Sequence, residues 1–182
     1  MTLILASGSP QRRAILQALD VAFEIRPTDV AEDEAGPAID VARGNALRKA
    51  LAVQRGRDDV VLGVDTVVAA ETALWGKPAD AGAAGRTLRA LSGRTHEVVS
   101  GFALVDSDGV RAGHDTTLVT FRDLTAAVVD WYVASGEWEG RAGGYAIQGR
   151  GGALIRRIEG DYLNVVGLPV AALLDAGLPG FG

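Results

Sequence analysis

The sequence predicts one mixed α/β domain, in which helices cover a sheet that contains both parallel and antiparallel strands. The 182 residues are enough to bury one core and too few for two ordinary domains, so we expect residues 1–182 to form a single unit. Short β-rich runs alternate along the chain with segments of helical apolar spacing. Two long β-rich runs flank the turn residues 106–109, which predicts an antiparallel hairpin and excludes a purely parallel sheet.

The first half of the chain predicts three strands and two helices. Strands are expected at 2–6, at 23–26 and over 60–70. Ser9 is placed to cap the first helix, with Pro10 at its first position. Pro37 opens a second helix that ends near Gly56. We expect one apolar face on that second helix, made by Ile39, Ala42, Ala46, Ala50 and Val53.

The second half predicts a hairpin between helices. A helix is expected over 79–91, followed by hairpin strands at 98–105 and 110–121. Thr125 is placed to cap a helix that continues through Ala134. Two further strands are expected at 153–158 and 162–166, and Pro169 begins the last helix.

The composition restricts the kind of protein and its partners. Hydrophobic residues make up 48% of the chain and charged residues 23%, which excludes a disordered protein. The chain has no cysteine, which excludes disulfides and thiolate catalysis. A net charge of -5 disfavours non-specific binding to nucleic acid, because its phosphates require a broad basic surface. The longest apolar stretch, 60–70, is short and contains Asp65, so we expect no membrane partner. The absence of cysteine fits a reducing compartment, so we expect a cytoplasmic protein.

A candidate phosphate site lies where the first strand meets the first helix. The small residues Ser7 and Gly8 leave backbone N–H groups free at a helix N-terminus, and Arg12 and Arg13 add positive charge. A guanidinium can bind phosphate oxygens in a bidentate way. The segment has neither Walker A nor G-x-G-x-x-G spacing. The alternative is a well-capped helix with arginines on its surface.

Asp65 stands inside an apolar strand. Burying a carboxylate is unfavourable unless a cation, a metal or hydrogen-bond donors compensate for it, so such residues are often functional. The alternative is an aspartate that bonds to backbone amides at a strand end.

Other polar groups give weaker indications. Lys77 lies between Gly76 and Pro78, and Gln148 lies in the glycine-rich segment 143–149. His96 and His114 lack H-E-x-x-H spacing, so we expect both to be structural or exposed. No G-x-S-x-G elbow is present, which disfavours a serine hydrolase.

Taken together, these segments resemble the Maf family of nucleotide pyrophosphatases, and the likeness spans almost the whole chain. Residues 5–10 are similar to the family's S-x-S-P-[RQ]-R signature, and residues 62–66 to its G-[AS]-D-[TQ] strand. The remaining motifs follow in family order, at 76–78, 91–96, 145–149 and 166–169.

The resemblance implies a mixed α/β fold with a central groove. It also implies Mg2+ or Mn2+ dependence, and cleavage of a nucleoside triphosphate to a monophosphate and pyrophosphate. It places Asp65 at the catalytic base and also at the metal, together with Glu32. The implied substrate contacts are Ser7, Gln11, Arg12, Thr66, Lys77 and Gln148, of which Gln11, Thr66 and Gln148 relate to substrate choice. A homodimer is a further expectation from the family.

Two departures from the family pattern bear on these expectations. Residues 42–46 look like the family's A-x-x-K-A, with Asn45 where a lysine is usual, and Lys49 one turn later is placed to reach the site instead. Gln11 replaces the arginine typical of the branch that acts on dTTP and UTP, which Thr66 and residues 147–149 match. The motifs of the branch that acts on 7-methyl-GTP are absent. Two alternatives stay open: a pyrophosphatase for broad or modified nucleotides, and a non-catalytic nucleotide-binding regulator of cell division.

Overall fold

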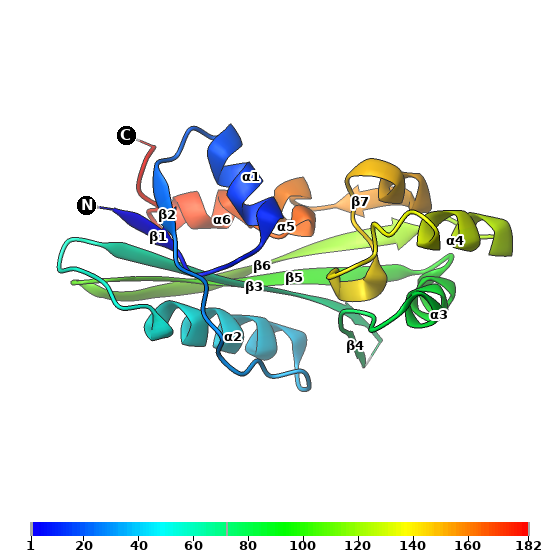
Figure 1. Ribbon diagram of the computed structural model, residues 1–182, viewed down its shortest axis with the longest axis horizontal. Helices are drawn as coiled ribbons and strands as arrows, with labels where there is room; N and C mark the ends of the chain where they lie inside the picture. Colours follow the sequence, from blue (N-terminus) through cyan, green and yellow to red (C-terminus); the bar gives the residue numbers. More distant parts are fainter. Residues whose placement is uncertain (1, 72, 182) are drawn as a thin grey trace.

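The computed structural model describes residues 2–71 and 73–181, and its centre is a seven-stranded mixed sheet (Figure 1). The strands are β1 Leu3–Leu5, β2 Phe23–Ile25, β3 Val60–Ala70, β4 Ala73–Trp75, β5 Thr95–Asp106, β6 Gly109–Phe121 and β7 Ile155–Glu159. Their order across the sheet is β2-β1-β3-β5-β6-β7, with β4 paired to the far end of β3. Because β1 is parallel to β2 and β3 while β3, β5, β6 and β7 pair antiparallel, the predicted mixed sheet is confirmed.

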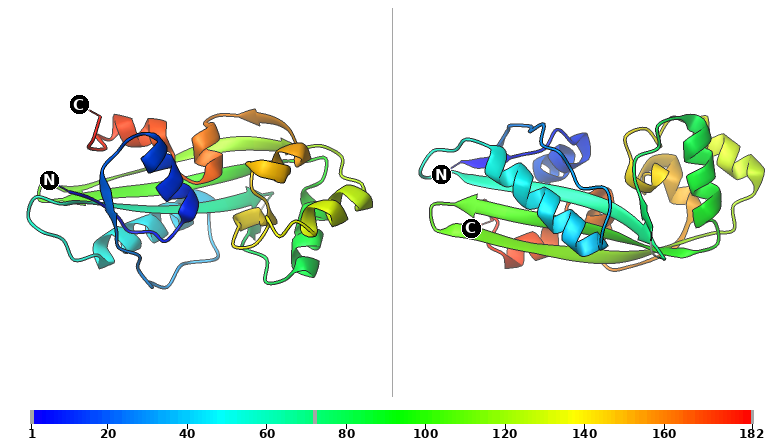
Figure 2. Two further views of the ribbon diagram at one scale, coloured as in Figure 1. Left: turned by 45° about the horizontal axis from the view of Figure 1, so that its top comes forward. Right: turned by 90° about the horizontal axis from the view of Figure 1, so that it is seen from below.

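Helices cover both faces of this sheet. They are α1 Pro10–Ala18, α2 Ala38–Ala52, α3 Ala81–Leu91, α4 Ala126–Val133, α5 Tyr162–Val166 and α6 Val170–Asp175, with 3-10 turns η1 Ala142–Gly144 and η2 Gly149–Leu154. At one end of the sheet α2 lies on one face and α1, α5 and α6 lie on the other, while α3 and α4 gather at the opposite end (Figures 1 and 2). None of the helices in the described residues is both long and apolar enough to cross a bilayer.

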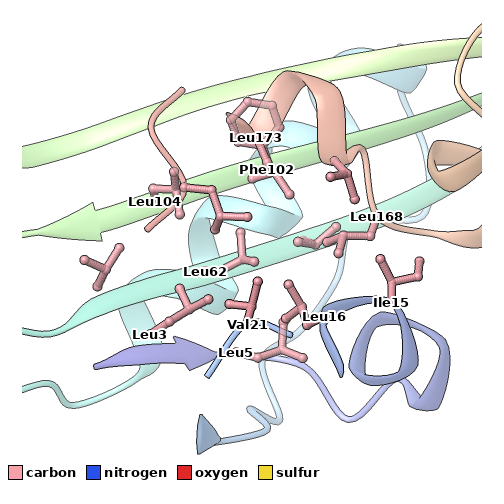
Figure 3. Packing of buried hydrophobic residues seen from close by; sticks show 14 residues of the cluster. Leu3, Leu5, Ile15, Leu16, Val21, Leu62, Phe102, Leu104, Leu168 and Leu173 are labelled. Atoms are coloured by element: carbon pink, nitrogen blue, oxygen red, sulfur yellow. The ribbon is translucent and has the colours of Figure 1, made fainter. Parts of the chain in front are cut away.

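Alternate side chains of β3 pack against the helices on opposite faces of the sheet. Leu62 packs with Leu16 and Leu173 in the core under α1 and α6 (Figure 3), whereas Val61 packs with Ala50 under α2. Burying one such leucine contributes roughly 1.5–3 kcal/mol, so both layers hold β3 in register. Asp65 has the same parity as Val61 and therefore projects toward α2.

The helix α2 rests directly on the backbone of the sheet. A Cβ on Gly63 of β3 would overlap the carbonyl oxygen of Ala46, and a Cβ on Gly101 of β5 would overlap the backbone of Ala42. Gly101 is the register partner of Asp65. The two glycines therefore allow α2 to lie close above the carboxylate.

Most predicted elements are confirmed, including the caps at Ser9 and Thr125. The strand expected at 162–166 is wrong. These residues form α5, because the Asp161 side chain caps the turn by accepting the N–H of Leu163 at 2.8 Å, and Asn164 is buried with its amide bonded to Val98 O and Thr117 Oγ1.

Several predicted bounds were also wrong, including the start of the first hairpin strand, which is Thr95 and not residue 98. The second helix ends at Ala52 and not near Gly56, and Ile39 is exposed instead of lying on the buried face. Residues 153 and 154 belong to η2, so the strand expected from 153 begins at Ile155.

Candidate active site

A groove of about 760 Å³ crosses the sheet where β3 has a free edge. On that edge, β1 pairs with β3 only as far as Leu62, and β4 begins to pair at Val68. Between these points β5 is the only strand that pairs with β3 in residues 2–71 and 73–181. The groove is lined by all eight predicted site residues, which are Ser7, Gln11, Arg12, Glu32, Asp65, Thr66, Lys77 and Gln148.

Arg12 is held at the first wall of the groove, at the start of α1. Its side chain is buried, with Nη1 donating to Ser7 Oγ at 2.8 Å and Nη2 to Thr66 Oγ1 at 3.1 Å. Its Nε donates to the carbonyl of Gly167 at 2.9 Å. Burial lowers the pKa of Arg12 below its ordinary value, while the charges of Asp65 and Glu32 act to raise it. All three partners are uncharged, so the positive charge is left for an anion in the groove.

Asp65 lies at the floor of the groove and is paired with a lysine. Lys49 Nζ contacts Asp65 Oδ1 at 2.6 Å and Glu32 Oε1 at 2.8 Å, so one ammonium group joins both carboxylates. The Lys49 and Asp65 side chains are only 10% and 9% exposed, whereas that of Glu32 is 39% exposed. The compensation that a buried carboxylate requires is therefore supplied by Lys49 of α2.

The second oxygen of Asp65 accepts a hydrogen bond from Asn45. Nδ2 of Asn45 donates to Asp65 Oδ2 at 2.9 Å, and the same amide bonds to the backbone of Asp33. Both oxygens of Asp65 therefore accept from side chains of α2.

The second wall of the groove carries Lys77, Arg141 and Gln148. Two segments form this wall, the one after β4 and the one at η1. They are joined by a hydrogen bond from the N–H of Gly143 to the carbonyl of Gly76 at 3.1 Å. Gly143 has a φ of 69°, and a Cβ there would press against Val68 at 3.0 Å, so glycine is required for this close contact.

Tyr145, next to this second wall, is buried against His96. Its hydroxyl lies 2.8 Å from Nε2 of His96, and both side chains are buried. Burial lowers the pKa of His96 to about 4 and raises the pKa of Tyr145 well above its ordinary value, so both are uncharged at neutral pH. His114 is exposed, and neither histidine lines the groove, which agrees with the expected structural or surface roles.

Three groove cations have no carboxylate partner within 4.0 Å among the described residues. They are Arg12, Lys77 and Arg141, whereas Lys49 is paired to acids. All three line the same groove, so a chain with net charge -5 offers positive side chains to a polyanion at one place, beside the acidic residues Glu32, Asp33, Glu34 and Asp65. The groove volume lies within the usual range for small-molecule sites, roughly 300–1,000 Å³.

Comparison with known proteins agrees with this geometry. The family model of Maf-like proteins matches residues 2–176. The chain belongs to the Maf family.

Several relatives align with this chain over almost the whole length of both proteins. A protein of Pyrococcus furiosus named dTTP/UTP pyrophosphatase is 41% identical over 180 residues, covering 94% of this chain and 92% of that protein. A protein of Bacillus mycoides with the same name is 43% identical over 176 residues, with the same coverage. A solved structure of a nucleoside-triphosphatase / dITP/XTP pyrophosphatase from Mycobacterium abscessus has a TM-score of 0.44 and 20% identity, covering 69% of this chain and 76% of that one.

The Maf resemblance implies a divalent ion, and the donor set of the groove suits one that arrives with its substrate. Glu32 and Asp65 both contact Lys49 Nζ, so the two carboxylates lie close enough together to share one cation. In the part of the chain that the structure describes, no three His, Cys, Asp or Glu side chains cluster as a metal site. Mg2+ is commonly held by one or two carboxylates together with water and substrate phosphates, so two carboxylates are sufficient.

The position of Lys49 corrects the alignment of one Maf motif. Residues 46–50 themselves read A-x-x-K-A, with Lys49 as the lysine, so the match to residues 42–46 was four residues too early. The prediction that Lys49 reaches the site is confirmed, because its ammonium group contacts Asp65. Sequence reasoning did not identify Arg141 or Trp75 as groove residues, because neither belongs to a motif with recognisable chemistry.

Proposed function

We propose that this protein hydrolyses nucleoside triphosphates of the dTTP and UTP type to a nucleoside monophosphate and pyrophosphate, using Mg2+ or Mn2+. One observation carries the proposal: the buried carboxylate of Asp65 opens onto the same groove as three cations that lack acidic partners. Carboxylate and cations together fit hydrolysis of a polyanion better than binding alone. The printed activity of the relatives, dTTP/UTP pyrophosphatase, supports this substrate class.

In this proposal the cations bind the phosphates and Asp65 accepts a proton. Arg12 and Lys77 hold the triphosphate across the groove, so that its α phosphorus lies near Asp65. A water attacks that phosphorus and gives its proton to Asp65, while the bond from the α phosphorus to the bridging oxygen breaks and pyrophosphate leaves with the electron pair. A divalent ion held by Glu32 and Asp65 would neutralise phosphate charge during this step.

Substrate choice is assigned to Thr66, Gln148 and Gln11. Thr66 already bonds to Arg12, and Gln11 accepts a hydrogen bond from Ser9 Oγ at 3.2 Å, so both side chains are oriented at the first wall. Gln148 is exposed on the second wall, where an amide can bond to a base edge. A role in removing non-canonical nucleotides would follow if this recognition is permissive.

Pyrophosphate release tests the proposal directly. Wild-type protein is assayed with dTTP, UTP, the other common triphosphates and modified nucleotides at equal concentration, with and without Mg2+. Asp65→Asn should lower turnover by on the order of 10²–10⁴ while the protein stays folded by circular dichroism. Normal turnover in that variant would show that Asp65 is not the base.

The same panel separates the alternatives. Nucleotide binding without pyrophosphate release would indicate a non-catalytic regulator, and equal rates across the panel would indicate a broad pyrophosphatase. The cytoplasmic location and the homodimer stay predictions, which cell fractionation and sedimentation would check.

A further inference from the structure

We propose that Asn45 is a positioning residue that fixes the spacing between the carboxylates of Glu32 and Asp65, so that a cation can be shared between them. This inference rests on the proposed function for its catalytic consequence, but its structural part can be tested independently.

Asn45 joins the loop that carries Glu32 to the strand that carries Asp65. Its side chain is 1% exposed on α2. Its Oδ1 accepts the backbone N–H of Asp33 at 2.8 Å, and its Nδ2 donates to the carbonyl of Asp33 at 3.0 Å and to Asp65 Oδ2 at 2.9 Å. Oδ1 also accepts from Arg48 Nη2 of α2, and both polar atoms of the amide contact Asp33 or Asp65.

The orientation of the Asn45 amide is fixed by the protein backbone. An N–H can only donate and a carbonyl can only accept, so the two bonds to Asp33 determine which end of the amide is oxygen. The nitrogen must then face Asp65, and it requires an acceptor there. Asn45 consequently holds Oδ2 of Asp65, while Lys49 holds Oδ1.

The loop on the other side has few attachments of its own. Residues 26–37 contain neither helix nor strand. Among the described residues, the backbone of 27–36 bonds to the rest of the protein through Asn45 alone. Two side-chain ion pairs also hold the loop, Arg48 with Asp33 at 2.7 Å and Lys49 with Glu32 at 2.8 Å. Without Asn45, the backbone beside Glu32 would lose these bonds, and the spacing between Glu32 and Asp65 would depend on the two ion pairs alone.

Replacing Asn45 by leucine removes all of these bonds at similar volume. We expect the Mg2+ concentration for half-maximal activity to rise about 10- to 100-fold, as is typical when the partners of metal ligands are removed. Asn45→Asp should be no better, because a carboxylate cannot donate to Asp65 or to the Asp33 carbonyl. The backbone amide of Asp33 should lose its protection in hydrogen exchange measured without metal or nucleotide.

A matched control separates positioning from general loss of stability. Asn164 is equally buried, and its amide bonds to Val98 O and Thr117 Oγ1 and to neither Glu32 nor Asp65. Asn164→Leu should lower the melting temperature and leave the Mg2+ requirement of the enzyme unchanged.

The inference is overturned if Asn45→Leu keeps both the wild-type Mg2+ requirement and the protected Asp33 amide. It is also overturned if Asn164→Leu raises the Mg2+ requirement as much as Asn45→Leu does. If wild-type protein releases no pyrophosphate, the proposed function fails, and the exchange of the Asp33 amide still decides whether Asn45 holds the loop.

Discussion

Replacing Lys49 by methionine tests how far the stability of this fold depends on the charge pair at the floor of its groove. Methionine keeps the length and the apolar stem of lysine and removes only the ammonium group. Asp65 would then be left with Asn45 as its remaining donor among the described residues, and Glu32 would lose its contact.

The expected magnitude follows from the burial of the pair. Lys49 and Asp65 meet at 2.6 Å with side chains that are 10% and 9% exposed. Removing one partner of a buried ion pair costs about 3–5 kcal/mol, because the other charge stays buried without compensation. Since Asn45 still donates to Asp65 and the groove admits water, we expect the lower end, about 3 kcal/mol.

Urea denaturation measures this difference, and Lys77 provides the control. A slope of about 2 kcal/mol/M converts the loss into a fall of about 1.5 M in the unfolding midpoint. Lys77 is an exposed lysine of the same groove with no ion pair among the described residues. Lys77→Met should change the free energy of unfolding by less than about 0.5 kcal/mol. Both variants should lose pyrophosphatase activity.

Equal unfolding midpoints for the two methionine variants would refute the reasoning. That result would mean that the ammonium group of Lys49 does not compensate a buried charge, and that the Lys49–Asp65 contact is no stronger than a surface ion pair.

Three further predictions concern the supports of the groove. Gly101→Ala should destabilise the protein by about 1–3 kcal/mol in thermal unfolding and lower activity, because its Cβ would push α2 off the sheet. Between pH 7.5 and 5, wild-type protein should lose about 2 kcal/mol more stability than the His96→Asn variant. The reason is that a pKa lowered to about 4 keeps His96 neutral in the folded protein, whereas the histidine of the unfolded chain takes up a proton near pH 6.5. Equal losses of stability in the two proteins would contradict this. Arg141→Ala should weaken product inhibition by pyrophosphate about tenfold, whereas Arg150→Ala, outside the groove lining, should leave it unchanged.

The sequence was sufficient to predict the position of Asp65 but not its partners. An aspartate within an apolar strand needs compensation, and this need is visible in the residues around it. Which groups supply it depends on how α2 sits over β3, and that is set by contacts of Gly63 and Gly101 with the helix backbone. Lys49 was accordingly considered as a substitute, while the link from Asn45 to Asp33 had no signal in the sequence.

The segment Tyr162–Val166 shows the limit of local propensity. Its aromatic and β-branched residues are typical of strands. The fold makes it a short helix because Asn164 finds acceptors on β5 and β6, which lie far away in the sequence. Such a long-range requirement outweighs the preference of five residues.

The seating of α2 on Gly63 and Gly101 also determines which part of the groove can vary. Main chain lies against main chain there, so repacking side chains in the core cannot alter the height of the helix above the sheet. The distance between α2 and Asp65 is thereby fixed by the backbone. Adaptation to a different base would have to come from the second wall of the groove. There the backbone around Gly143 is rich in glycine, and the side-chain amide of Gln148 is exposed to solvent.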